Sequence, residues 1–175
     1  MKVVICGSRR FNDADADAAV AEAVERSRYE VTTVVSGVAP GIDRAGERWA
    51  ESRGIQADRY PADWDRYGRA AGPIRNKQMV DVADAVIAVM WMGIESRGTA
   101  STIGFTRQAG KPLAIAHAYK TDLDDGEVAL VVEREGPMRV VTPSGEVLHR
   151  GTWPITEKED WPGYDESGGS CDQSG

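Results

Sequence analysis

The sequence predicts an α/β fold, a Rossmann-like parallel sheet with helices on both faces. Short apolar runs alternate with stretches in which apolar residues recur at helical spacing, the pattern of parallel strands joined by crossover helices. The run 85–90 is apolar throughout, as expected of a strand that helices cover on both faces. Glycine-bearing loops follow several of these strands, and such sheets bind ligands at the carboxyl ends of their strands.

The N-terminal third of the chain alternates strands and helices. Asn12 or Asp13 can cap the first helix, whose apolar residues fall on one face. Gly54 ends the second helix, because glycine is common directly after the last helical turn. We expect, in order, a strand at 2–6, a helix at 13–28, a strand at 31–35, a helix at 42–54 and a strand at 55–60.

The next segment, 61–73, has the composition of an irregular loop. It contains aromatic residues, two prolines and two glycines, and it is long for a connection, which makes it a candidate for function. Regular spacing then resumes. We expect a helix at 74–83, a strand at 85–90, a helix at 99–109 and a strand at 112–116.

The pattern changes after Ala118. Short β-like runs separated by Gly-Pro and Pro-Ser-Gly turns predict a small antiparallel appendage with strands near 128–132, 138–142 and 146–148. The end of the chain is acidic and then rich in glycine and serine, which is typical of disorder. We predict a Rossmann-like domain at 1–118, a β appendage at 119–155 and a disordered tail at 156–175.

Composition restricts the partners. The chain has 175 residues, of which 41% are hydrophobic, and a formal net charge of -7. This size supports one sizeable core, and the acidic surface argues against non-specific nucleic-acid binding. Cys6 and Cys171 lack the spacing of a disulfide framework or metal cluster. No apolar stretch approaches the roughly 20 residues of a membrane span. We expect a cytoplasmic protein with no membrane partner, metal or cofactor.

Three strand-to-helix loops carry candidate anion-binding groups. The amides of a helix's first turn have no partner inside the helix, and the aligned peptide dipoles add about half a positive charge there. The first loop offers Gly7 for close backbone approach, the hydroxyl of Ser8 and the charged fork of Arg9. None of the loops has the dinucleotide G-x-G-x-x-G spacing or the lysine of a P-loop, which argues against ATP hydrolysis of that type.

The second loop spans 36–43. Ser36 can donate from its hydroxyl, and Gly37 and Gly41 permit positive φ. Asp43 falls in the first turn of the following helix. It either holds a ribose hydroxyl or complements the helix dipole.

Two further segments extend the candidate site. Arg75 and Met79 are four apart on a helix and share a face, which suits a ligand with an anionic end and a flat ring. The alternative is a surface arginine above a core methionine. Trp91, at a strand end, either stacks on a base or belongs to the core.

The last loop combines a sharp turn with a helix start. Gly93 allows the turn, Arg97 supplies a cation, and Gly98 and Thr99 open the helix. This combination predicts a phosphate-binding nest.

Conventional catalytic groups are scarce. His117 and His149 lie outside these loops, and each is interpreted as a lone structural or surface imidazole. Cys6 precedes the first loop, where a buried cysteine acting as a small hydrophobe is commoner than an activated thiolate. We predict no catalytic residue.

Together these loops resemble those of the SLOG superfamily, which groups the Smf/DprA and LOG proteins, and most closely its YspA-like branch. The resemblance covers residues 2 to about 117. It implies a Rossmann-like sensor or binding protein whose ligand is nucleotide-derived, from mononucleotide to ADP-ribose in size, and a homodimer. The motifs that carry it are Gly7-Ser8-Arg9, Ser36-Gly37-x-Ala39-x-Gly41-x-Asp43, Trp49-Ala50, Pro61-Ala62-Asp63-Trp64, Gly68-Arg69-Ala70-Ala71-Gly72-Pro73-x-Arg75-Asn76-x-x-Met79 and Trp91-x-Gly93-x-x-x-Gly98-Thr99.

Two relatives within this superfamily define alternatives. LOG proteins are phosphoribohydrolases that use an arginine and a glutamate; Arg75 matches the arginine, but Thr102 stands where the glutamate would be and cannot supply a carboxylate. DprA binds single-stranded DNA, which needs a basic groove with stacking aromatics that this acidic chain offers only locally. The predicted ligand-binding residues are Gly7, Ser8, Arg9, Ser36, Gly37, Ala39, Gly41, Asp43, Arg75, Asn76, Met79, Trp91, Gly93, Arg97, Gly98 and Thr99.

Overall fold

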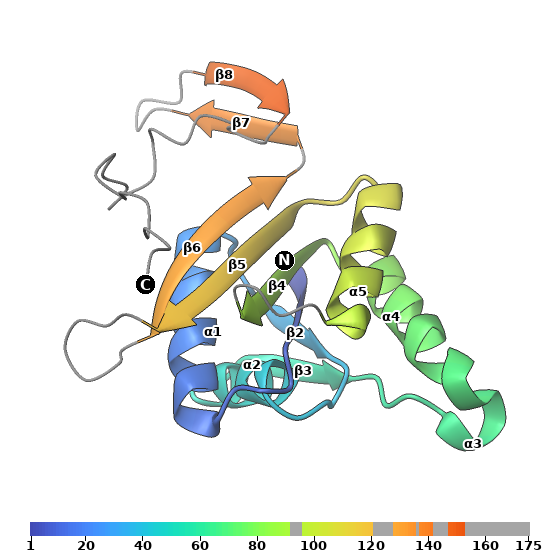
Figure 1. Ribbon diagram of the computed structural model, residues 1–175. Coiled ribbons are helices and arrows are strands. Elements are labelled where there is room, and N and C mark those ends of the chain that lie inside the picture. The colour runs from blue at the N-terminus through green and yellow to red at the C-terminus, as the bar shows by residue number, and fades with distance from the viewer. Residues whose placement is uncertain (92–95, 121–127, 136, 142–146, 153–175) are drawn as a thin grey trace, which may run out of the picture.

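A six-stranded sheet forms the centre of the computed structural model (Figure 1). The structure describes residues 1–91, 96–120, 128–135, 137–141 and 147–152. The strand order is β3-β2-β1-β4-β5-β6; the first five of these strands are parallel, and β6 runs antiparallel to β5. The predicted Rossmann-like α/β fold is confirmed. The strands are β1 (Lys2–Gly7), β2 (Thr33–Ser36), β3 (Gln56–Arg59), β4 (Ala85–Trp91), β5 (Leu113–Lys120) and β6 (Val128–Glu135), with β7 (Pro137–Val141) and β8 (Val147–Thr152) paired in a separate sheet.

Helices cover the sheet on both faces. Two of them pack on one face and two on the other, as right-handed crossovers between parallel strands require (Figure 1). The helices of one face are α1 (Asp13–Ser27) and α2 (Ile42–Glu51), those of the other are α4 (Ala71–Val82) and α5 (Arg97–Gln108), and a short helix α3 (Trp64–Tyr67) and a 3-10 turn η1 (Gly68–Ala70) precede α4. None of the described helices has the length and apolar character needed to cross a membrane.

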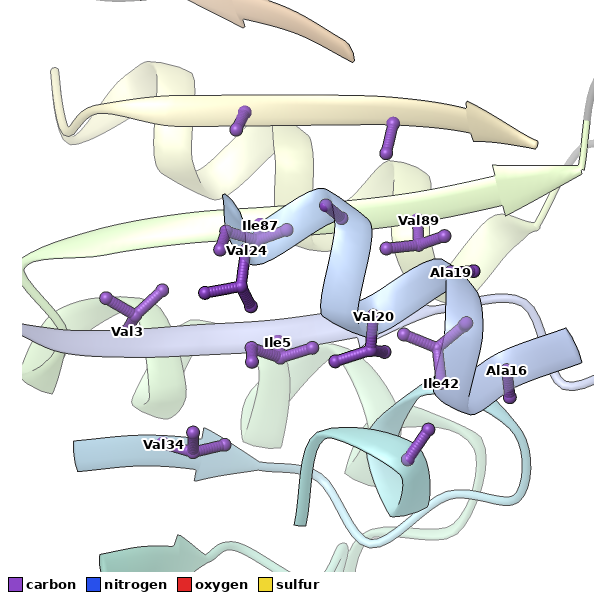
Figure 2. Packing of buried hydrophobic residues seen from close by; sticks show 14 of the residues in the cluster. Val3, Ile5, Ala16, Ala19, Val20, Val24, Val34, Ile42, Ile87 and Val89 are labelled. Atoms are coloured by element: carbon purple, nitrogen blue, oxygen red, sulfur yellow. The ribbon is translucent and has the colours of Figure 1, made fainter. Parts of the chain in front are cut away.

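Two apolar clusters fill the space between the sheet and its helices. Side chains alternate along β1, so Val3 and Ile5 belong to the cluster under α1 and α2, whereas Val4 belongs to the cluster under α4 and α5. Figure 2 shows Val20 and Val24 of α1 above this part of the sheet. All of these side chains are buried. The continuous apolar runs in the sequence therefore mark strands that are covered on both faces.

The cap of the first helix is Asn12. Its side-chain oxygen accepts a hydrogen bond from the amide of Asp15 at 2.8 Å. The second helix ends at Glu51, three residues before the predicted end at Gly54. Gly54 instead closes the following turn, where it adopts a φ of 65° and donates to the carbonyl of Glu51 at 3.1 Å.

The prediction of an irregular segment at 61–73 was wrong. Asp63 caps α3 by accepting a hydrogen bond from the amide of Arg66 at 3.0 Å, and η1 leads directly into α4. Pro73 lies in the first turn of α4, where a residue without an amide proton costs the helix nothing. Proline and glycine in this segment therefore mark helix starts, so that a pattern dominated by turn residues concealed short helices.

The C-terminal strands differ from the predicted appendage. The run 128–135 forms β6, which pairs with β5 from Leu113 opposite Glu135 to Lys120 opposite Val128 and so extends the main sheet. This pairing covers the edge that β5 would otherwise leave open. β7 and β8 pair with each other, and a separate unit at 119–155 is not confirmed. The predicted tail at 156–175 lies outside the described residues.

Between β1 and β4 lies the point at which the chain changes the side of β1 on which it adds strands. From β1 the chain continues to β2 and β3 on one side, and then crosses to β4 and β5 on the other. The loops that follow β1 and β4 consequently diverge to opposite faces, and a crevice remains between them. In open α/β sheets, this switch point is where ligands bind.

Two helical glycines provide a test of the core packing. A Cβ at Gly46 would lie 3.0 Å from a methyl carbon of buried Ile5, whereas a Cβ at Gly104 would meet no described atom within 4 Å. We therefore expect Gly46→Ala to lower the free energy of unfolding by about 1–3 kcal/mol through overpacking. Gly104→Ala is the matched control and should raise it by about 0.5–1 kcal/mol through helix propensity. Chemical denaturation measures both, and equal effects would contradict the packing of α2 on β1.

Candidate functional site

A cavity of about 480 Å³ lies at the carboxyl ends of β1 and β4. It is bounded by the loop that follows β1, the start of α2, the segment from α3 through α4, and the first two turns of α5. The described residues that line it are Cys6, Gly7, Arg9, Ala39, Asp43, Trp64, Arg69, Gly72, Pro73, Arg75, Asn76, Met79, Ser96, Arg97, Gly98, Thr99, Ser101 and Thr102.

Arg75 forms the centre of this site. It projects from α4 and is buried, with 7% of its surface exposed. Its guanidinium donates to the carbonyls of Gly37 and Tyr60, and its Nε donates to the side chain of Asn76 at 3.0 Å. Burial lowers the pKa of Arg75, but an arginine starts so high that the group stays charged at neutral pH. Arg75 therefore ties α4 to the loops that follow β2 and β3.

Gly37 makes room for this arginine. A Cβ at this position would collide with the guanidinium of Arg75 and would lie 2.7 Å from a carboxylate oxygen of Asp43. Gly37 does not use the positive φ that glycine permits; the left-handed conformation falls on Val38, with a φ of 63°. Gly41 does adopt positive φ, at 78°. The two glycines of this loop thus serve different purposes.

Asp43 is a buried carboxyl beside Arg75. Only 4% of its surface is exposed, and burial raises its pKa to about 6. The positive charge of Arg75 opposes this rise, and so do hydrogen bonds from the amides of Ala39 and Gly7 and the charge of Arg9. Asp43 thereby joins the loop after β1 to the loop after β2, and it can carry or release a proton near neutral pH.

The N-terminus of α5 opens into the same cavity. Ser96 caps the helix, accepting from the amide of Thr99 at 3.4 Å and bonding to its hydroxyl at 2.9 Å. Asn76 donates to the carbonyl of Gly98 at 3.1 Å, which fixes this helix end against α4. The amides of Arg97 and Gly98 lie in the first turn and have no acceptor within the helix. The dipole of this 12-residue helix makes its N-terminus favourable for negative charge.

The charge of the cavity is opposite to that of the protein. Among the described lining residues are four arginines and one carboxyl group, that of Asp43, whereas the whole chain has a formal net charge of -7. No hydrogen bond or ion pair to another described residue holds the guanidinium groups of Arg9, Arg69 and Arg97. These cations are available to an anionic ligand.

Most of the predicted ligand-binding residues meet in this cavity, and some do not. Gly93 lies outside the described residues. Ser8, Ser36, Gly37, Gly41 and Trp91 are described but do not line the cavity. The predicted residues that line it are Gly7, Arg9, Ala39, Asp43, Arg75, Asn76, Met79, Arg97, Gly98 and Thr99.

Two of the residues outside the cavity have internal partners. The Ser36 hydroxyl donates to buried Glu47 at 2.6 Å and accepts from the amide of Val38 at 3.0 Å. Trp91 stacks on Phe11, with ring centroids 4.5 Å apart and an interplanar angle of 13°. Of the two interpretations of Trp91, this contact favours the core.

Cys6 lies in the cavity wall as a thiol. Burial and the nearby charge of Asp43 raise the pKa of Cys6 to about 12, so that it is protonated at neutral pH. This agrees with its interpretation as a small hydrophobic residue. Among the described residues, no three His, Cys, Asp or Glu side chains gather closely enough to hold a metal ion.

The sequence did not assign two prominent residues of the cavity. Trp64 and Arg69 come from α3 and η1, in the segment that was predicted to be irregular. The sequence does carry a signal for them, because the length and the aromatic content of this segment mark it as a candidate for function. A helix start in place of a loop is what brings their side chains to the cavity.

The fold and the cavity together define an open α/β protein with an anion-complementary site at its switch point. A model of the YspA, cpYpsA-related SLOG family matches residues 1–67. The chain is also 33% identical over 118 residues to the Gene 61 protein of Mycobacterium phage D29, a match that covers 64% of this chain and 93% of that protein. The chain belongs to the YspA, cpYpsA-related SLOG family, and the predicted resemblance is confirmed.

The raised pKa of Asp43 predicts a specific pH dependence of stability. An aspartate in the unfolded chain ionises near pH 3.9, so the folded state binds the proton more tightly between about pH 4 and pH 6. The stability that this proton contributes is complete below pH 4 and is lost as the pH rises through 6. Asp43→Asn keeps a neutral side chain at every pH, and should therefore exceed the wild type in unfolding free energy by about 3 kcal/mol at pH 7 and by little at pH 4.

Denaturant titrations at several pH values measure this difference. Asp65→Asn is the matched control, because it removes a carboxylate from the exposed surface of α3. A constant difference between Asp43→Asn and the wild type from pH 4 to pH 7 would contradict the assignment.

Proposed function

We propose that this protein binds a nucleotide or a nucleotide-derived small molecule, from mononucleotide to ADP-ribose in size, as a sensor or binding protein. The observation that carries the proposal is the positively charged cavity at the switch point of an acidic protein. An acidic surface repels anions in general, so four arginines and a helix N-terminus in one cavity favour a specific anion. Family membership supports a nucleotide-related ligand in a broad sense.

The size and lining of the cavity support a ligand of this class. Its volume of about 480 Å³ falls within the range of small-molecule sites. The first turn of α5 and Arg97 suit a phosphate, while Asp43 can accept a hydrogen bond from a ribose hydroxyl. The apolar side chain of Met79 and the ring of Trp64 offer surface to a base.

Binding measurements test the proposal. We expect at least one of AMP, ADP-ribose, NAD and a cyclic nucleotide to bind in calorimetric titration. Arg97→Ala should weaken that binding at least about tenfold, because a charge-assisted hydrogen bond to phosphate is lost. Arg53→Ala is the matched control, since Arg53 stacks on Trp49 and does not line the cavity. Absence of binding across the whole panel would contradict the proposal.

Hydrolysis of a nucleoside monophosphate is the second candidate function. Thr102 lines the cavity but cannot replace the glutamate of LOG proteins. Asp43, from another element, brings a carboxyl with a pKa of about 6 into the same cavity as Arg75. In such a reaction water would attack C1′ of the ribose as the N-glycosidic bond breaks, and protonated Asp43 would give its proton to the departing base. The proton that the attacking water loses would return to the Asp43 carboxylate.

Product analysis distinguishes binding from hydrolysis. Incubation of the protein with AMP, followed by chromatography, detects adenine and ribose 5-phosphate. Turnover that disappears in Asp43→Asn would establish the hydrolase, whereas unchanged AMP at high protein concentration would exclude it for this substrate.

Binding of single-stranded DNA has less support. Trp64 and Tyr67 are exposed aromatics near Arg66 and Arg69, which is a local version of a stacking platform. The net charge of -7 opposes the approach of a polyanion. A gel shift at low salt that weakens steeply with added salt would favour this alternative over a small ligand.

A further inference from the structure

Trp64 presents an open aromatic ring at the cavity. More than half of its surface, 54%, is exposed, although tryptophan is usually buried in large part. It begins α3 and lines the cavity. Exposed aromatic surface at a cavity that also carries a few charged groups is a common feature of ligand sites.

The other tryptophans that the structure describes have partners for their rings. Trp91 stacks on Phe11, and the guanidinium of Arg53 lies over Trp49 at 4.5 Å from the ring centroid. No such ring or cation partner from the described residues covers Trp64. Its faces are available for stacking.

Helix α4 sets the separation between this ring and the anion-binding end of the cavity. The ring edge of Trp64 lies over Gly72, because a Cβ at that position would stand 3.4 Å from Cη2 of the indole. Asn76, four residues further along, is bonded to the carbonyl of Gly98. Four residues of helix span roughly 6 Å. The contacts that α4 makes with the indole and with the first turn of α5 are thus offset by about one helical turn along its axis, and the ribose of a nucleotide can span such an offset.

We propose that Trp64 stacks on the base of a nucleoside 5′-phosphate whose phosphate binds at the first turn of α5, beside Arg97 and Gly98. This inference rests on the proposed function and adds an orientation to it. The phosphate lies at the end of the cavity held by Asn76, the ribose lies along α4 near Asp43, and the base lies at the rim under the indole. Stacking recognises the flat face that every base has, so Trp64 provides affinity for a base without selecting among bases.

A pair of ligands that differ only by the base tests the proposal. AMP and ribose 5-phosphate share the phosphate and ribose, and only AMP can stack. We expect Trp64→Ala to weaken AMP binding about tenfold or more and to change ribose 5-phosphate binding by less than about twofold. Trp64→Phe, which keeps an aromatic ring, should restore most of the affinity for AMP.

Tyr67→Ala is the matched control. Tyr67 is an exposed aromatic of the same short helix, with 40% of its surface exposed, but it does not line the cavity and Arg66 lies over its ring. The Tyr67→Ala variant should bind AMP and ribose 5-phosphate as the wild type does. Circular dichroism of each variant checks the fold.

The outcomes separate this proposal from the one on which it rests. Equal weakening of both ligands in Trp64→Ala would show that Trp64 only shapes the site, and unchanged AMP binding would place the base elsewhere. Either result would overturn the proposal and leave the nucleotide site standing. If the wild type binds neither ligand nor any nucleotide of the panel, the proposed function fails and the role of Trp64 fails with it.

Discussion

The geometry of the site depends on the buried guanidinium of Arg75. An arginine so deeply placed is tolerated only when acceptors surround it, and here the carbonyls of Gly37 and Tyr60 and the side chain of Asn76 do so. Gly37 belongs to the loop after β2, Tyr60 directly follows β3, and Asn76 belongs to α4. One cation thereby fixes the relative positions of these segments. Asn76 extends the connection to α5 through the carbonyl of Gly98.

The same arrangement places opposing demands on stability and binding. Arg75 adds positive charge to the interior, and Asp43 offsets it without being fully ionised at mildly acidic pH, since its pKa is about 6. A fold selected for stability alone would favour a neutral side chain at position 43, because ionising a buried carboxyl opposes folding. Perturbed ionisable groups of this kind gather in functional sites, and both of these line the cavity. The strain of Val38, a β-branched residue with positive φ, lies in the same loop.

Periodicity and turn chemistry predicted the sheet and the main helices of the first 118 residues, because strands buried on both faces and one-sided helices leave clear patterns in a sequence. The structure of the loops could be predicted only in part. Glycine, arginine and a helix start predicted that the loops at Gly7 and Gly98 would meet, and both line the cavity. The reason for Gly37 could not be predicted, since it depends on an arginine 38 positions away. Trp64 was hidden for another reason: proline and glycine mark both loops and helix starts, and only the capping bond of Asp63 distinguishes them here. The pairing of β6 with β5 likewise depends on contacts between segments, which the local sequence pattern does not specify.

The glycine loops therefore have different roles in the site, and this difference distinguishes the chain from a dinucleotide-binding fold. In that fold the glycines of a single loop bring the backbone close to a pyrophosphate. Here the loop after β2 turns a carbonyl, that of Gly37, toward Arg75, and a carbonyl repels phosphate. In the proposed anion site its contribution is thus indirect, through the cation that it positions, while direct contact would fall to the amides at α5 and to Arg9 and Arg97. The groups that would recognise an anion are side chains and one helix end from several segments, so the shape of the site depends on how α4 is held against the sheet.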